Sequence, residues 1–238
     1  MEKETCSNIT KNSLTIIVAF LLSASAFCED VKVIEPEVKD ILNLSVFEGK
    51  DIITEIRKAW DGDKTADDKV VSESNKIGRN GCSWYCGGKV ATITASSNLP
   101  IQENITYLPM NVHDFDIRTA WVVNKNNYGI GEYIEYHFDA DTPRPTKVQI
   151  LNGYMKNEKL WKENSRVKQL KLYLNDKLIA KLNLQDNTGV QKYFIGTPFE
   201  SKIHPAYKLK FEIADVYKGE KYSDTAISEL TFEGIDVH

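Results

Sequence analysis

The residues with the most chemical potential in this chain form a single run, His113 to Trp121. It places an imidazole beside two carboxylates, Asp114 and Asp116, and follows them with the hydroxyl of Thr119. A histidine beside an acid can act in general acid–base catalysis, and carboxylates with a hydroxyl can hold a cation. Aspartates in loops also accept hydrogen bonds from nearby backbone amides. Local bonding within a loop is favoured over catalysis for His113.

Motifs that would identify an enzyme are missing from the sequence. The stretch Gly129-Ile130-Gly131 lacks the third glycine and the strand-before, helix-after context of a dinucleotide loop. There is no Gly-x-Ser-x-Gly, no His-Glu-x-x-His and no phosphate-cradling loop. The sequence therefore predicts a protein that is not an enzyme, with a hydrolase as a distant alternative.

Cys82 and Cys86 form a close pair in a glycine-flanked loop. In an exported protein, a disulfide is the first interpretation of such a pair. Zinc is the alternative, and it needs two more ligands. The candidates, none at zinc-finger spacing, are His113, His137, His204 and His238.

The N-terminus has the pattern of an export signal, which we assign to residues 1–28. Lys3 and Lys11 precede the apolar stretch 14–22, and Ala24-Ser25-Ala26 supplies small residues for cleavage. This predicts a secreted, periplasmic or cell-surface protein. Cys28 raises the alternative of a lipid anchor, although Phe27 stands where a lipoprotein normally has a small residue.

Composition excludes some partners. The 238 residues carry a net charge of −4, without a long acidic or basic block. Nothing in this charge pattern favours nucleic acid or an anionic membrane surface.

Residues 29–81 differ from the remainder. Ile52, Ile53, Ile56 and Trp60 recur at helical spacing, and the polar run 61–68 follows them. We expect a short helical N-terminal segment and a linker here.

From residue 82 to residue 238 the pattern is one of short strands and turns. Alternating or β-branched residues predict strands at 90–95, 133–138, 147–151, 170–174, 182–184, 209–213 and 230–232. Strands of this length without intervening helices predict a mostly β protein, an antiparallel β-sandwich or jelly roll.

Several motifs occur in a characteristic order along this region. They are 82–88 (CSWYCGG), 95–99 (ASSNL), 120–122 (AWV), 129–132 (GIGE), 150–154 (ILNGY), 164–168 (NSRVK) and 221–229 (KYSDTAISE). The set resembles the glycan-binding translocation domain of secreted bacterial NAD-glycohydrolase toxins, a discoidin-like, galactose-binding jelly roll. The resemblance covers roughly residues 82–235 and leaves no residues for a catalytic part. It implies a non-catalytic module that binds a glycan, with adhesion to a surface protein as the alternative.

The resemblance also implies a structural calcium ion. Discoidin-like modules commonly carry Asp-Gly-Asp-x-x-Thr-Ala-Trp, and a Glu on the last strand helps to hold the ion. Asp114, Asp116, Thr119 and Glu229 are the matching residues here, with Phe115 in place of the glycine. Calcium prefers such hard oxygen ligands. The alternative is that both aspartates cap the loop.

Aromatic side chains and amides in loops are the candidate glycan contacts, because sugars bind to aromatic faces and hydrogen-bonding side chains. They are Trp84, Tyr85, Asn126, Tyr128, Tyr154 and Trp161. Core packing is the alternative for Trp84. Arg166 is expected to pair with a structural carboxylate.

Overall fold

The computed structural model describes residues 31–77, 84–123, 127–196 and 205–234. These belong to one compact unit, Val31–His238. The predicted export signal, Cys28, Cys82 and Asn126 lie outside the described residues, so the signal, the lipid anchor and the disulfide stay predictions. Within the described ranges, no helix is long and apolar enough to cross a membrane.

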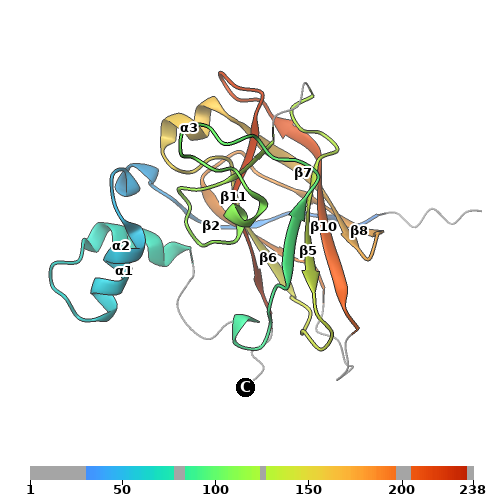
Figure 1. Cartoon of the computed structure of the whole chain (residues 1–238), viewed down its shortest axis with the longest axis horizontal. Coiled ribbons are helices and arrows are strands. Elements are labelled where there is room, and N and C mark those ends of the chain that lie inside the picture. Colours follow the sequence, from blue (N-terminus) through green and yellow to red (C-terminus); the bar gives the residue numbers. More distant parts are fainter. Residues whose placement is uncertain (1–30, 78–83, 124–126, 197–204, 235–238) are drawn as a thin grey trace, which may run out of the picture. The chain divides into compact units, whose positions relative to one another are not determined.

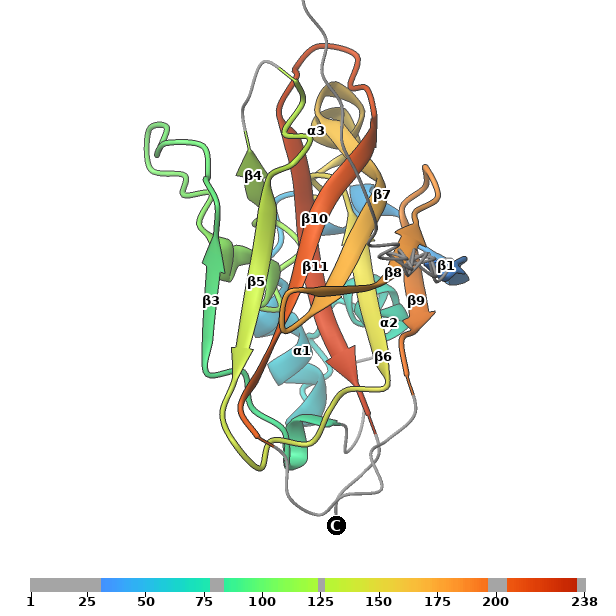
Figure 2. The ribbon, with the colours of Figure 1, turned by 90° about the vertical axis from the view of Figure 1, so that its right-hand side faces the viewer.

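The strands form a β-sandwich. They hydrogen-bond in the order β2-β9-β6-β11-β7-β10-β5-β3, with β4 on β11, β8 on β7 and β1 on β8. Their bounds are β1 (Val33–Ile34), β2 (Glu37–Ile41), β3 (Thr92–Ala95), β4 (Trp121–Val123), β5 (Tyr133–Phe138), β6 (Lys147–Asn152), β7 (Ser165–Leu174), β8 (Lys177–Asn183), β9 (Gly189–Phe194), β10 (Tyr207–Tyr217) and β11 (Thr225–Glu233). β11 and β7 pair in parallel through Thr225 and Ala226. On either side of this link the strands form two facing layers (Figures 1 and 2).

Alternation along the strands builds the main core. In β5, Ile134, Tyr136 and Phe138 are buried while the residues between them are partly exposed. β10 alternates in the same way, and both strands pack against Ile150 of β6 and Phe232 of β11 in the other layer. Because successive side chains of a strand point to opposite faces, this pattern leaves the outer face of the β3-β5-β10-β7 layer polar. The predicted mostly β jelly roll is confirmed.

A helical layer covers the outer face of the other sheet (Figure 1). It consists of η1 (Leu44–Phe47), α1 (Ile52–Trp60) and α2 (Asp68–Lys76). The predicted helix is confirmed as α1; its first turn is capped by Asp51, whose carboxylate accepts the Thr54 amide at 3.2 Å. The sequence did not indicate α2, whose residues are mostly polar.

These helices share a second apolar cluster with the jelly roll. Phe47, Ile52 and Val70 pack with Leu151 of β6 and Val190 of β9. The N-terminal segment also supplies β1 and β2, which pair with β8 and β9. Residues 31–77 are therefore part of the same compact unit, whereas the sequence suggested a helical segment apart from the jelly roll.

Short helical turns complete the described elements. They are η2 (Trp84–Cys86), η3 (Pro109–Val112) and α3 (Glu158–Glu163). η3 precedes the loop that leads into β4, and α3 follows β6 directly.

Trp84 of η2 is a core residue. It has no exposed surface, and its indole Nε1 donates to the Pro143 carbonyl at 2.8 Å. A Cβ on Gly88 would lie 2.2 Å from the ring, and one on Gly234 would lie 2.4 Å from it. A side chain so enclosed has no face for a ligand, so the prediction of a glycan contact at Trp84 is wrong.

We expect Trp84→Ala to lower the free energy of unfolding by about 3–5 kcal/mol, because it leaves a cavity in a closely packed core. Urea denaturation measures this change, and Trp84→Phe is expected to be intermediate. Trp60→Ala is the matched control: that indole is 75% exposed, and the change should stay within about 0.5 kcal/mol. Equal stability of Trp84→Ala and Trp60→Ala would contradict the assignment of Trp84 to the core.

Candidate functional site

The loop 113–119 is held together by its own side chains. The Asp114 carboxylate accepts the amide of Asp116 at 2.9 Å and the hydroxyl of Thr119 at 2.8 Å. The same Thr119 hydroxyl lies 3.0 Å from the Asp116 carbonyl. Phe115 takes the left-handed conformation, with φ of 63°, at the position where related loops have glycine.

Arg118 supplies a cation to this loop. Its Nε and Nη2 donate to the two oxygens of Asp116 at 2.8 and 2.6 Å. Its Nη1 donates to the Lys50 carbonyl at 2.5 Å, which links the loop to the N-terminal segment. The hydrogen bond to Asp116 raises the pKa of the Arg118 guanidinium, and the side chain is 29% exposed.

Glu229, the fourth expected calcium ligand, is buried on β11 with 2% exposure. It is in register with Leu151, which packs with Ile117 in the second apolar cluster. Register partners share a face of a sheet, so Glu229 lies on the face that the loop covers.

The calcium ion that the sequence led us to expect stays a prediction, and the carboxylates of the loop have donors within the protein. All four carboxylate oxygens of Asp114 and Asp116 accept hydrogen bonds within the loop, three of them donated by Arg118. Nowhere in the described part of the chain do three or more His, Cys, Asp or Glu side chains gather closely enough to hold a metal.

Two of the expected aromatic contacts have little to offer a ligand. Tyr154 is 5% exposed, and burial raises the pKa of its hydroxyl to about 12. It packs edge-on against Tyr107, so the predicted glycan contact at Tyr154 is wrong. Tyr85 is partly buried, and its hydroxyl accepts the Phe232 amide at 2.9 Å.

Tyr128 and Trp161 keep some exposure. The Lys218 ammonium lies 5.1 Å from the centroid of the Tyr128 ring. The Trp161 indole donates to the Asn152 carbonyl at 2.9 Å, and the Arg166 guanidinium lies 4.6 Å from its ring centroid.

The expected structural partner of Arg166 is present. Its Nε lies 2.6 Å from the Asp186 carboxylate, and its Nη1 donates to the Asn164 carbonyl at 2.8 Å. Arg166 therefore fixes the segment after α3 rather than awaiting a ligand.

A cleft of about 490 Å³ lies where three loops meet: the η1–α1 loop, the loop before β4 and the loop after β6. Besides Phe47, the side chains that line it are polar: Glu48, Lys50, Asp51, Arg118, Lys156 and Asn157. We call it the loop cleft. None of the five expected glycan contacts that the structure describes lines it. Lys156 and Asn157 lie in the sequence between two of those contacts, Tyr154 and Trp161, but residues 48–51 had no signal linking them to a binding site.

Some of the charged side chains that line the loop cleft have partners within the protein, and others do not. Lys50 pairs with Asp67 at 2.9 Å, and hydrogen bonds from the Thr54 hydroxyl and amide lower the pKa of Asp51. Within the described ranges, Glu48 and Lys156 make no side-chain hydrogen bond or ion pair. The cleft therefore offers a carboxylate and an ammonium to a polar ligand.

The family model of the NAD glycohydrolase translocation F5/8 type C domain matches residues 84–233. No curated protein matches. The CBM32-1 and CBM32-2 domains from Clostridium perfringens ZmpB, solved in complex with GalNAc, are 16% identical, with 61% of this chain and 33% of that chain covered and a TM-score of 0.43.

Two further solved structures are similar. The family 32 CBM from C. perfringens NanJ, in complex with galactose, is 14% identical, covers 58% of this chain and 90% of that chain, and has a TM-score of 0.42. The GH29 fucosidase E1_10125 from Ruminococcus gnavus, in complex with fucose, is 15% identical, covers 72% of this chain and 31% of that chain, and has a TM-score of 0.35. The match thus spans about a third of the ZmpB and fucosidase chains.

The family model covers more than half of the 238 residues, and its span runs from η2 to the end of β11. The chain therefore belongs to the family of NAD glycohydrolase translocation F5/8 type C domains.

Proposed function

We propose that this protein is a non-catalytic, exported carbohydrate-binding module that recognises a glycan through the loop cleft. The observation that carries the proposal is the pair Glu48 and Lys156, which line one cleft from two segments and are engaged by no other described residue. Family membership supports it, and so does the placement of the cleft among loops of a β-sandwich, where ligands commonly bind.

A sugar suits this chemistry. Its hydroxyls both donate and accept hydrogen bonds, so a carboxylate and an ammonium can each bind one without a net charge on the ligand. Trp161 of α3 lies one helical turn beyond the N-cap Asn157, and the part of its ring that Arg166 leaves exposed can contact apolar C–H groups of the sugar.

The test is a glycan array with wild-type protein and Lys156→Ala. We expect Lys156→Ala to weaken glycan binding by about tenfold, since a hydrogen bond to a charged group contributes about 1.5–3 kcal/mol. Lys159→Ala is the matched control, because Lys159 is an exposed lysine of α3, three residues further along the chain, and does not line the cleft.

Absence of binding to every glycan on the array would contradict the proposed function. If Lys156→Ala and Lys159→Ala weaken glycan binding equally, the loop cleft is not the glycan site. Capture of a surface protein by the same purified chain, with no glycan bound, would favour the adhesion alternative.

The environment of His113 supports a structural role over acid–base catalysis. Its Nδ1 lies 2.9 Å from the Leu230 carbonyl, and its ring packs against Tyr136 and Phe232. Burial lowers the pKa of His113 below its ordinary value of 6.5. A buried neutral imidazole is suited to hold the loop against β11.

This pKa shift predicts a pH dependence of stability. As pH falls below about 6.5, the unfolded chain gains a proton on His113 before the folded protein does, so the free energy of unfolding decreases. His113→Gln retains a donor for the Leu230 carbonyl and removes the titration. We expect its free energy of unfolding to depend less on pH between pH 7 and pH 5.5 than that of the wild type, measured by urea denaturation. Parallel pH profiles of the two proteins would contradict this role.

We also propose that Arg118 provides the positive charge that calcium would bring to the loop. Addition of calcium or EDTA is then expected to leave the melting temperature of the wild type unchanged. Arg118→Ala is expected to cost about 1–3 kcal/mol, since it leaves Asp116 without its charged donors. Lys64→Ala, an exposed cation remote from the loop, is the control. A melting temperature that rises with calcium and falls with EDTA would contradict the proposal.

A further inference from the structure

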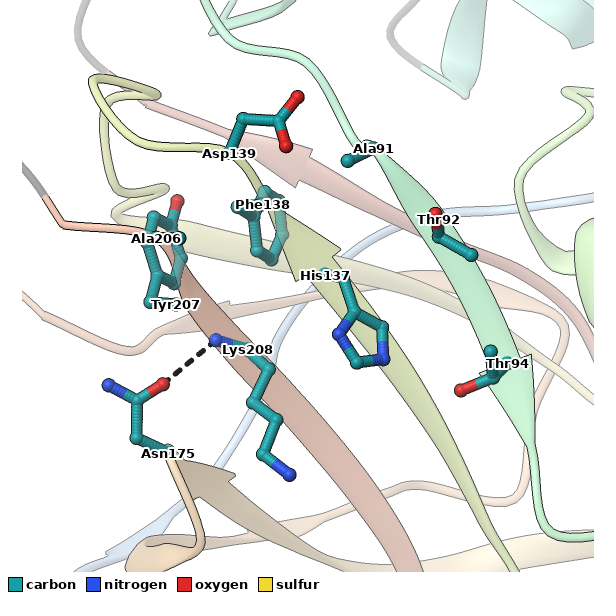
Figure 3. Close-up of a pocket in the computed structure, with 10 residues that line it drawn as sticks. All are labelled: Ala91, Thr92, Thr94, His137, Phe138, Asp139, Asn175, Ala206, Tyr207 and Lys208. Atoms are coloured by element: carbon teal, nitrogen blue, oxygen red, sulfur yellow. Dashed lines mark hydrogen bonds between the residues drawn. The ribbon is translucent and has the colours of Figure 1, made fainter.

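A second hollow lies on the opposite side of the sandwich, on the outer face of β3, β5 and β10 (Figure 3). It has a volume of about 620 Å³, and we call it the sheet groove. Its polar lining consists of Thr92, Thr94, His137, Asp139, Asn175 and Lys208. Neither the sequence motifs nor the loop cleft accounts for it.

Strand register aligns these side chains. Thr92 of β3 is opposite His137 of β5, which is opposite Lys208 of β10. Thr94 is opposite Glu135 in the next row. Since neighbouring strands lie about 4.8 Å apart, the three strands present rows of polar groups at a spacing comparable to that of hydroxyls along a sugar chain.

The basic side chains of this groove face carboxylates. The Lys208 ammonium lies 3.2 Å from Glu135 and 3.0 Å from Asp176. His137 Nε2 lies 3.0 Å from the second oxygen of Glu135. Asp139 also lines the groove and makes no ion pair with a described residue, so the carboxylates outnumber the ammonium group and favour a neutral ligand over an anion.

The remaining groups are hydrogen-bonding and held in position. The Asn175 side-chain oxygen accepts the Lys208 amide at 2.9 Å, which directs its amide nitrogen away from β10 (Figure 3). The hydroxyls of Thr92 and Thr94 are on exposed residues of β3. At one end, Phe138 and Tyr207 stack with ring centroids 4.5 Å apart and support the groove from below.

We propose that the sheet groove is a second carbohydrate site, which binds a neutral oligosaccharide across β3, β5 and β10. Its volume is within the range of about 300–1,000 Å³ that small-molecule sites have. Its six polar side chains offer hydrogen bonds that a sugar can use and that a lipid or an apolar peptide would leave unmade. A protein with both sites would hold two glycan segments at once, which strengthens attachment to a surface that carries many glycans.

The test is NMR titration of the full chain, isotope-labelled, with lactose, maltotetraose and cellotetraose, and with 3′-sialyllactose as a charged counterpart. We expect at least one neutral sugar to shift the amide signals of Thr92, Thr94, His137 and Lys208. The shifts should be the same in Lys156→Ala, because that variant alters only the loop cleft. The charged sugar is expected to bind this groove more weakly.

Thr92→Val with Thr94→Val removes both hydroxyls and keeps β-branched side chains on the strand, and we expect binding at least about fivefold weaker. Thr106→Val, at an exposed threonine outside the groove, is the matched control. Should the double variant not fold, Asn175→Asp retains the acceptor for the Lys208 amide, removes the amide donor and is expected to weaken binding similarly.

Failure of all three neutral sugars to shift the groove signals overturns the proposal, and so do shifts that persist unchanged in the double variant. Shifts that occur only around Lys156 would support the loop cleft and overturn the sheet groove. Shifts that occur only on β3, β5 and β10 would support the sheet groove and contradict glycan binding in the loop cleft.

Discussion

The structure depends on the burial of both faces of β11 by other parts of the protein. Its Ile227, Leu230 and Phe232 belong to the main core, while Ser228 and Glu229 are also buried. A strand with polar side chains buried on its outer face requires hydrogen-bonding partners there. The Ser228 hydroxyl meets this need by donating to the Ile117 carbonyl and accepting the Met155 amide. The loop before β4 and the segment after β6 are thereby brought to the same strand.

Those two segments, once held on β11, form two of the walls of the loop cleft. The third comes from the N-terminal segment, whose Phe47 and Ile52 pack into the same apolar cluster as Ile117 and Met155. Arg118 connects the walls electrostatically, because one guanidinium binds both the Asp116 carboxylate and the Lys50 carbonyl. A planar group with several fixed donors can satisfy both acceptors at once, which an ammonium does less well.

The two faces of the sandwich differ for a simple reason. The outer face of β6 and β9 is apolar at Leu151 and Val190, and the helices cover it. The outer face of β5 and β10 carries Glu135, His137 and Lys208, whose contacts with one another need no further protein layer. The first face therefore places loops and helices together in a charged cleft, whereas the second remains an open sheet with polar rows.

Local patterns by themselves indicated seven of the described strands and one helix. The alternation from Tyr133 to Phe138 identified β5, the spacing from Ile52 to Trp60 identified α1, and the ordered motifs identified the family, because each of these signals lies within a few neighbouring residues. Trp84 and Tyr154 were expected at a ligand, since the sequence shows aromatic character but not the atoms that enclose a ring. Only the tertiary structure decided that both are buried, that Val33–Ile41 joins the sheets as β1 and β2, and that Lys50 meets Arg118. Such contacts join residues far apart in the chain, so they follow from how the layers pack and leave no trace in local spacing.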